Sequence, residues 1–152
     1  MGFLTGKTAI ITGGGRAVLS NGECGSIGYG IATAYAKEGA NLVLTGRNVQ
    51  KLTDAKEELE KKYGIKVLPV QADVSAGSDN EAIVQNVVKQ AIDTFGRIDV
   101  LINNAQASAS GVTIADHTTE QFDLAVYSGL YAAFYYMKAC YPYLKETKGS
   151  AI

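Results

Sequence analysis

The sequence is poor in cysteine and histidine, and neither residue forms a recognisable chemical pattern. Only two cysteines and one histidine occur in 152 residues. Cys24 and Cys140 lack the spacing of a metal-binding or redox pair, and Cys140 lies in an apolar stretch typical of a core. His117 is interpreted as a surface residue near a helix start, with a substrate contact as the alternative. We therefore expect free thiols, no metal site and a cytoplasmic protein.

Long apolar runs and blocks of like charge are also missing. Fourteen basic and fifteen acidic residues are mixed along the chain and give a net charge of −1. No basic tract indicates a nucleic-acid partner. No apolar run is long enough to span a bilayer, and the first residues lack a signal pattern, so no membrane partner is expected. Residues 1–152, 47% hydrophobic, are expected to form a single domain.

Short apolar segments alternate with helical ones along the whole chain. Glycines 39, 64 and 96 stand just before the next apolar segment, where a helix C-cap is expected. The apolar segments barely alternate in polarity, which is typical of strands buried on both faces. The expected strands are 7–12, 41–45, 66–71 and 98–102, and the expected helices are 27–38, 49–63 (capped by Asn48), 79–95 and a long one from Thr118 or Thr119 toward Lys145, which Pro142 kinks or shortens.

This alternation predicts a parallel sheet with right-handed crossovers. The expected fold is a Rossmann-type doubly wound α/β sheet with strand order 3-2-1-4 and helices on both faces. Residues 149–152 are expected to begin a fifth strand.

A glycine-rich turn directly follows the first expected strand. Gly13 and Gly15 belong to this turn, and Ser26, Ile27 and Gly28 begin the next helix. Glycine lets a backbone approach phosphate groups closely, and the free N–H groups of the helix start favour negative charge. These five residues are therefore predicted to hold the pyrophosphate of a dinucleotide.

Taken together, the motifs resemble those of the short-chain dehydrogenase/reductase family over essentially the whole chain. The family's T-G-x-x-x-G-x-G turn is matched in part by Thr12-Gly13 and Ser26-Ile27-Gly28. Asp73-Val74 resembles its D-V pair, Asn103-Asn104-Ala105 its N-N-A-G segment, and Phe122-Asp123 the start of its fourth helix. The resemblance implies an oxidoreductase that moves hydride between a nicotinamide cofactor and a carbonyl or alcohol, with a 3-oxoacyl thioester as one substrate class.

The resemblance also implies further cofactor contacts. Asp73 and Val74 would lie by the adenine, and Asn103 and Ala105 would also contact the cofactor. Two structural alternatives stay open. Asp73 could cap the turn after the third strand, and the Asn103 amide could tie neighbouring strands together.

Charge at the end of the second strand favours NADP(H) over NAD(H). An acidic residue there holds the ribose 2′-hydroxyl in NAD sites, but this sequence has Gly46 followed by Arg47. A guanidinium can bind a 2′-phosphate through two hydrogen bonds. Arg47 facing solvent is the alternative. Arg16 is either a second cation for the phosphate or a solvated side chain.

The sequence departs from the family pattern at several positions. The phosphate loop is lengthened by residues 16–25, and Ser26 stands where the second glycine belongs, which is similar to divergent enoyl-acyl-carrier-protein reductases. Gln106 replaces the glycine of N-N-A-G, and Gly129 replaces the fourth-helix asparagine of the catalytic tetrad.

The family's catalytic serine and Y-x-x-x-K pair are not matched by this chain. Residues 141–145 spell Y-x-x-x-K, but in the wrong helix and with Pro142 inside it. We therefore expect no catalytic residue here, a chain truncated before the catalytic segment, and no activity of the chain alone. The alternatives are a divergent enoyl reductase and a non-catalytic nucleotide-binding or assembly half-domain.

Tyrosines cluster in the last expected helix. Tyr127, Tyr131 and Tyr135 recur at four-residue spacing. Stacking on nucleic acid is disfavoured because basic partners are missing. A mixture of core packing and a homo-oligomer interface is expected, since aromatic residues bury a large area per side chain.

Overall fold

The computed structural model describes residues 2–152, which form one five-stranded parallel sheet flanked by helices. The strand order is β3-β2-β1-β4-β5, so the predicted order 3-2-1-4 and the beginning of a fifth strand are both confirmed. The strands are β1 (Thr8–Thr12), β2 (Asn41–Gly46), β3 (Val67–Gln71), β4 (Val100–Ile102) and β5 (Ser150–Ala151).

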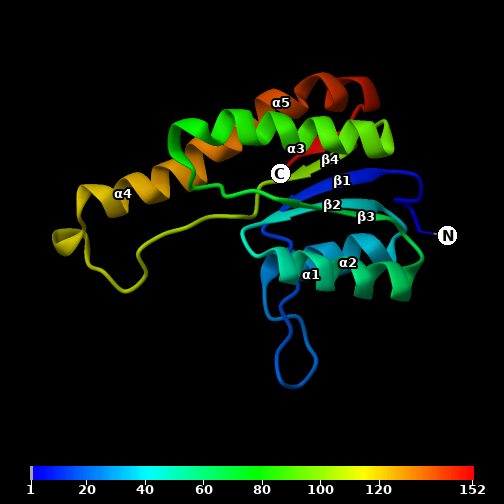
Figure 1. The fold of residues 1–152 in the computed structure, drawn as a ribbon, viewed down its shortest axis with the longest axis horizontal. Helices are drawn as coiled ribbons and strands as arrows, with labels where there is room; N and C mark the ends of the chain where they lie inside the picture. The colour runs from blue at the N-terminus through cyan, green and yellow to red at the C-terminus, as the bar shows by residue number, and fades with distance from the viewer. Residues whose placement is uncertain (1) are drawn as a thin grey trace.

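Helices cover both faces of the sheet, as a doubly wound fold requires. Helices α1 (Ile27–Lys37) and α2 (Val49–Tyr63) lie on one face, and α3 (Asn80–Phe95) and α5 (Ala132–Thr147) lie on the other (Figure 1). Helix α4 (Thr119–Ala125) runs into α5 through a π-helical segment, Val126–Tyr131.

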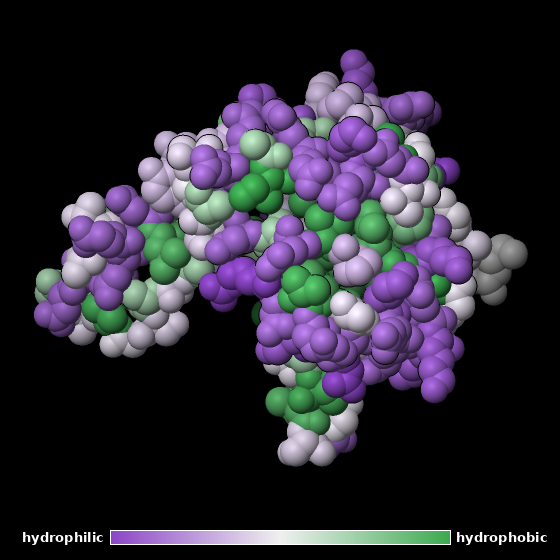
Figure 2. Space-filling view, viewed as in Figure 1, coloured by the Kyte–Doolittle hydropathy of each residue, from purple (hydrophilic) through white to green (hydrophobic). Residues whose placement is uncertain are grey.

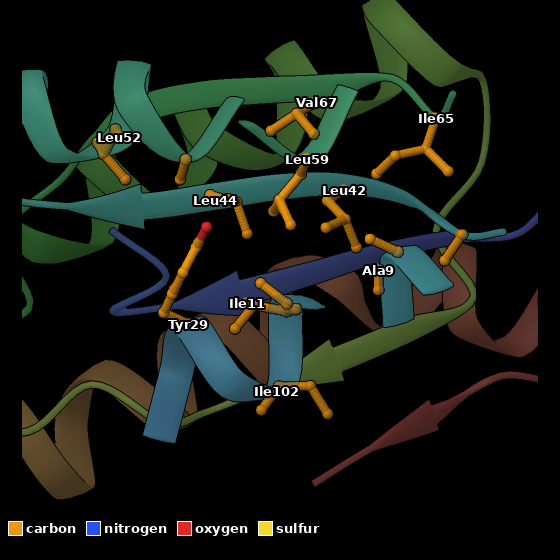
Figure 3. Packing of buried hydrophobic residues seen from close by; sticks show 14 of the residues in the cluster. Ala9, Ile11, Tyr29, Leu42, Leu44, Leu52, Leu59, Ile65, Val67 and Ile102 are labelled. Carbon is orange, nitrogen blue, oxygen red and sulfur yellow. The ribbon is translucent and has the colours of Figure 1, made fainter. Parts of the chain in front are cut away.

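Strand β1 shows why the apolar segments do not alternate in polarity. Every residue of β1 is buried. Ala9 and Ile11 pack in the cluster under α1 and α2, together with Leu42 and Leu44 of β2 (Figure 3). Ile10 points to the opposite face, into the cluster under α3 and α5. Both faces of the central strand therefore need apolar side chains.

The helix ends follow the predicted capping residues. Ser26 accepts a hydrogen bond from the Tyr29 N–H, and Asn48 accepts one from the Lys51 N–H. Thr118, rather than Thr119, caps α4 in a reciprocal capping box. Gly64, at the end of α2, takes a left-handed φ of 70°, which glycine adopts without strain.

Strand β4 begins at Val100, two residues later than the predicted start at 98. The Thr8 N–H at the start of β1 donates to the Asp99 carboxylate, 2.9 Å away, where a regular ladder would offer a backbone carbonyl. The Asp99 N–H still donates to the Thr8 carbonyl at 2.9 Å, so one backbone bond joins β1 to the residue before β4, and the Asp99 side chain supplies the other. The other predicted boundaries of strands and of the first three helices lie within one residue of those observed.

The predicted single long helix is three consecutive segments, and Pro142 does not shorten it. Helix α5 continues beyond Pro142 to Thr147. Proline has no N–H, so one backbone carbonyl of the preceding turn is left without a donor, and because Pro142 is exposed this carbonyl can bind water. Buried Cys140 and Leu144 hold the surrounding turns against the sheet.

Two segments project from the layered body. The loop 16–25 extends beyond α1, and the arm 107–125 carries α4 away from the sheet (Figure 1). Apolar side chains are visible on both projections in Figure 2, and Ile114 on the arm is 91% exposed. Among residues 2–152, no helix combines the length and the apolar character needed to cross a membrane.

Candidate functional site

The carboxyl ends of β1, β2 and β4 and the residues after β3 open onto a cleft of about 370 Å³. In open α/β sheets, ligands bind at the carboxyl ends of the strands, where the connections from two adjacent strands run to opposite sides of the sheet. In this sheet that point lies at β1, between β2 and β4. Seven of the ten residues predicted to bind cofactor line the cleft: Gly13, Gly15, Ser26, Arg47, Asp73, Val74 and Ala105.

The glycine turn brings β1, α1 and the end of β4 into close contact. Gly13 has a φ of 72°, and a Cβ there would lie 2.8 Å from the Asn104 amide nitrogen. Gly28 does not line the cleft, because it is buried under the turn, where a Cβ would overlap the Gly13 carbonyl oxygen. Glycine at both positions therefore lets α1 begin directly against the turn.

The start of α1 presents backbone donors beside the cleft. The first N–H groups of an α-helix have no acceptor within the helix, and those of Ile27 and Gly28 belong to this first turn. The Ile27 side chain is 77% exposed and is not part of the cleft lining. Ile27 therefore offers only its backbone to a ligand, and an anionic group suits this position.

Arg47 and Asp73 line the cleft at the ends of β2 and β3. Arg47 is exposed, and the Gln71 side-chain amide donates to its carbonyl oxygen at 3.0 Å. The Asp73 carboxylate accepts hydrogen bonds from the Ser75 N–H at 2.9 Å and the Ser75 hydroxyl at 2.6 Å. Asp73 thus caps its turn, as the alternative reading held, and also faces the cleft.

Asp73 is ionised in this arrangement. Burial raises the pKa of its carboxyl, but the hydrogen bonds from Ser75 and the nearby Arg47 charge outweigh burial and hold the pKa below its usual range. The cleft therefore carries the Asp73 carboxylate and the Arg47 guanidinium at its β2–β3 end, and Lys51 from the start of α2 adds a second cation to the lining.

Arg16 lies away from the cleft. Its guanidinium pairs with Glu58 of α2 at 2.5 Å, and its backbone N–H donates to the Lys51 carbonyl. This pair lowers the pKa of Glu58, with Arg16 as the largest cause. The structure therefore assigns Arg16 to fastening the long loop onto α2 rather than to the cleft.

The strand-tying amide is Asn104, not Asn103. Asn104 donates from its side chain to the Thr12 carbonyl at 2.8 Å, and the N–H groups of Asn104 and Ala105 both donate to the Thr12 hydroxyl. The Asn103 side chain lines a second, smaller cavity instead. The sequence could have indicated that the two asparagines have different roles, since successive side chains of an extended chain point to opposite faces.

The residues that depart from the family pattern lie together at this second cavity. Gln106 lines both cavities, and a Cβ on Gly129 would lie 3.7 Å from the Gln106 side chain. Ser128 accepts a hydrogen bond from the Ala107 N–H at 2.9 Å and so ties the π-helical segment to the chain after β4. Sequence analysis did not identify Ser128, because a serine within an apolar helix gives no distinctive signal.

Other chemistry-bearing residues lie outside both cavities. Tyr141 and Lys145 are exposed on α5, and the His117 ring is half-buried with its Nδ1 3.3 Å from the Thr113 carbonyl oxygen. Within residues 2–152, no three His, Cys, Asp or Glu side chains gather as metal ligands would.

The parallel sheet, the glycine turn and the helix that starts at the cleft define a Rossmann-type α/β protein. Residues 22–152 match the family model described as Enoyl-(Acyl carrier protein) reductase. The chain belongs to the short-chain dehydrogenase/reductase family, a family of oxidoreductases.

Among curated relatives, the chain is 65% identical to a 12alpha-hydroxysteroid dehydrogenase from a Clostridium species, covering 100% of this chain and 56% of the relative. An uncharacterized oxidoreductase of Bacillus subtilis is 36% identical, covering 98% of this chain and 47% of the relative. The chain thus spans about half the length of the curated relatives it matches.

Solved structures with the same fold include complexes with nicotinamide cofactors. The alcohol dehydrogenase of Thermococcus sibiricus with 5-hydroxy-NADP has a TM-score of 0.83 and 30% identity, covering 95% of this chain and 56% of that chain. The L-sorbose reductase of Gluconobacter frateurii with NADPH and L-sorbose has a TM-score of 0.82 and 31% identity, covering 99% and 52%.

Proposed function

We propose that this chain supplies the NADP(H)-binding part of an oxidoreductase that interconverts a hydroxyl and a carbonyl group on a hydroxysteroid. The observation that carries the cofactor assignment is the exposed guanidinium of Arg47 on the cleft, at the strand end where Gly46 replaces an acidic residue. An acidic side chain there would repel a 2′-phosphate, whereas Arg47 attracts it. The NADP-bound structural relatives support the same cofactor.

The remaining cofactor contacts follow from the cleft geometry. Gly13, Gly15 and Ser26 line the proposed pyrophosphate position, and the first N–H groups of α1, on Ile27 and Gly28, lie beside it, where the positive end of the helix favours negative charge. When bound, the nicotinamide ring supplies or accepts the hydride, and the protein orients it.

The adenine and nicotinamide ends of the cofactor are assigned to opposite ends of the cleft. Asp73 and Val74 border the adenine end beside Arg47. Ala105 borders the end near β4, and Asn103 lies behind it in the adjoining cavity. The proposed path therefore runs from β3, across the start of α1, to β4.

The substrate class rests on the 65% identical relative, whose name specifies a 12α-hydroxysteroid. This relative favours a steroid over the 3-oxoacyl thioester suggested by the sequence. The description of the matching family model favours enoyl reduction as the second candidate. Assays of the native protein that carries this chain, with 12α-hydroxysteroids, 3-oxoacyl and enoyl thioesters and either cofactor, separate the candidates. Turnover of an enoyl thioester alone would overturn the steroid proposal.

Cofactor choice is tested by titrating NADPH and NADH into the wild type and Arg47→Ala. We expect NADPH affinity to fall about 30-fold, because a charge-assisted contact contributes about 2 kcal/mol. NADH lacks the 2′-phosphate and should bind both proteins equally. Equal NADPH affinity in the two proteins would contradict the assignment. Binding without turnover of any substrate would instead favour the non-catalytic half-domain.

A homo-oligomer contact is proposed on the exposed side of the π-helical segment and α5. The rings of Tyr127 and Tyr131 lie in a tilted arrangement with centroids 5.3 Å apart and remain partly exposed, and Phe134 is 52% exposed in the same stripe. Tyr135 is largely turned inward and packs against the α3–α5 core. The stripe is therefore assigned to an interface and Tyr135 mainly to packing.

The charges beside this stripe favour a second copy of the chain, in antiparallel orientation, as the partner at the interface. Asp123 and Lys145 are both exposed and lie eleven positions before and after Phe134. A twofold axis at Phe134 would therefore place Asp123 of each copy opposite Lys145 of the other. Lys145→Glu should lower the mass measured by light scattering, and adding Asp123→Lys should restore it. A mass unaffected by either change would contradict this interface.

A cytoplasmic location remains part of the proposal.

A further inference from the structure

The second cavity lies between the end of β4, the π-helical segment and the start of α5. Its volume is about 210 Å³. Asn104, Ala105 and Gln106 line both this cavity and the larger cleft, so the two are separated by a single stretch of chain. A liquid water molecule occupies about 30 Å³, so the space suffices for several.

Two buried polar atoms at this cavity have no protein partner. In residues 2–152, four buried side-chain oxygens lack a hydrogen bond, and two of them are Asn103 Oδ1 and the Tyr136 hydroxyl. Both residues line the cavity, and Tyr136 is only 1% exposed. A buried hydroxyl or carbonyl without a partner costs about 1–3 kcal/mol, so both atoms call for a ligand.

The two hydroxyls beside these atoms are already paired. The Thr12 hydroxyl accepts from two backbone N–H groups and donates to the Ile102 carbonyl. The Ser128 hydroxyl accepts from Ala107 and lies 2.7 Å from the Leu124 carbonyl. Among the buried side-chain oxygens of the cavity lining, the unmet hydrogen-bonding capacity therefore lies on Asn103 and Tyr136.

The wall of the cavity is built from unusual helix geometry. Ser128 and Gly129 lie within the π-helical segment, and π-helical turns occur frequently at functional sites. Gly129 has no side chain to fill the space, and a Cβ there would contact only Gln106. This wall leaves room that an ordinary side chain at position 129 would occupy.

We propose that the cavity is an internal water-binding site in which ordered water links the Tyr136 hydroxyl to Asn103 Oδ1. Water can donate to the asparagine oxygen and both donate to and accept from the phenol. The water would join α5 to the end of β4, directly behind the cleft. Burial raises the pKa of Tyr136 to about 12, so its hydroxyl stays protonated and can both donate and accept a hydrogen bond.

A direct contact with Thr45 is the competing explanation. The Thr45 hydroxyl is also buried without a partner, and it lies near enough to Tyr136 to oppose part of the rise in pKa. If Tyr136 and Thr45 simply bonded to one another, the cavity would need no water.

Double-mutant cycles on the native protein separate the two explanations. The variants are Tyr136→Phe, Asn103→Leu and Thr45→Val, alone and in pairs, with the unfolding equilibrium constant measured in urea. Tyr136→Phe should raise the unfolding constant about fivefold, since it removes a satisfied group. Its effect should largely vanish when Asn103→Leu is already present, and should persist beside Thr45→Val.

Three results would overturn the proposal. One is an unfolding constant that Tyr136→Phe leaves unchanged or lowers, which marks an unpaired hydroxyl. The second is coupling of Tyr136 to Thr45 that equals or exceeds its coupling to Asn103. The third is a high-resolution crystal structure of the native protein without water density within hydrogen-bond distance of both atoms.

Discussion

The two sides of the cleft are built differently. On the β1–β2 side, glycine lets backbone segments touch, and the Thr12 hydroxyl and both caps have their hydrogen bonds. On the β4–α5 side, a π-helical segment borders a cavity, and Asn103 and Tyr136 keep unpaired oxygens. At the glycine turn the first side is closed by its own backbone, whereas the second side borders a cavity onto which two of the four unpaired oxygens open; the other two belong to Tyr29 of α1 and Thr45 of β2.

This difference indicates which side tolerates change. Where backbones meet at van der Waals distance, an added methyl group must move a helix. Where a cavity borders the helix, the same methyl group enters free space. The two sides should therefore respond with opposite signs to the same substitution.

The largest effect is expected from Gly28→Ala. The new Cβ would overlap the Gly13 carbonyl oxygen and lie 2.6 Å from the Asn104 amide, so α1 must shift away from the turn. We expect a loss of about 3 kcal/mol in unfolding free energy and loss of NADPH binding, measured by urea unfolding and by titration.

Gly30→Ala is the matched control in the same helix. A Cβ there meets only the Cys24 side chain, at 3.8 Å. Its unfolding free energy should stay the same or rise by up to about 1 kcal/mol, because alanine favours the helix. Similar losses from Gly28→Ala and Gly30→Ala would refute the close-packed turn.

The first side of the cleft was also the more predictable from sequence. Gly13 and Ser26 act through backbone freedom and capping, and the role proposed for Arg47 rests on charge, all of which depend on residue type and order. Asn103 and Asn104 could not be assigned separate roles, because which one meets Thr12 depends on the register of β4. The π-helical segment was missed altogether, since its sequence has ordinary helical periodicity.

The second largest effect concerns Asp99, which joins β1 to β4 at the edge opposite the cleft. Its carboxylate is 2% exposed and accepts from the Thr8 N–H and, at 2.6 and 2.8 Å, from Arg97. Burial raises the pKa of Asp99, but Arg97, the Thr8 N–H and Lys7 outweigh it and lower the pKa overall. Asp99→Asn should cost about 2 kcal/mol near neutral pH.

The pH dependence follows from this lowered pKa. The carboxylate stabilises the fold fully above the usual Asp pKa of about 3.9, and this contribution is lost as the pH falls through the folded-state value. The stabilities of wild type and Asp99→Asn should therefore converge in acid. Asp93→Asn, which breaks an exposed pair with Lys89, serves as the control and should leave the unfolding free energy almost unchanged at every pH. A constant gap between wild type and Asp99→Asn at all pH values would contradict the role of the charge.

An increase in unfolding free energy is expected from Gly129→Ala, the counterpart of Gly28→Ala on the β4–α5 side. Its Cβ would lie 3.7 Å from the Gln106 side chain, an ordinary contact. Replacing a helical glycine should add up to about 1 kcal/mol to the unfolding free energy. Thermal and urea unfolding measure this directly, and a loss above that size would show that the wall beside Gly129 is closed.

The smallest effect is expected from Arg16→Ala, which tests whether the long loop belongs to the cleft. Arg16 pairs with Glu58 on α2, and both side chains are more than a third exposed. Such an exposed pair contributes little to stability, and less at high salt. NADPH affinity should not change, whereas Arg47→Ala should reduce it about 30-fold through a lost contact worth about 2 kcal/mol. The two arginines, Arg16 paired with Glu58 of α2 and Arg47 on the cleft, would then be separated by function. A fall in NADPH affinity with Arg16→Ala would mean that the loop moves Arg16 onto the phosphate when cofactor binds, and the first side of the cleft would be less rigid than its packing indicates.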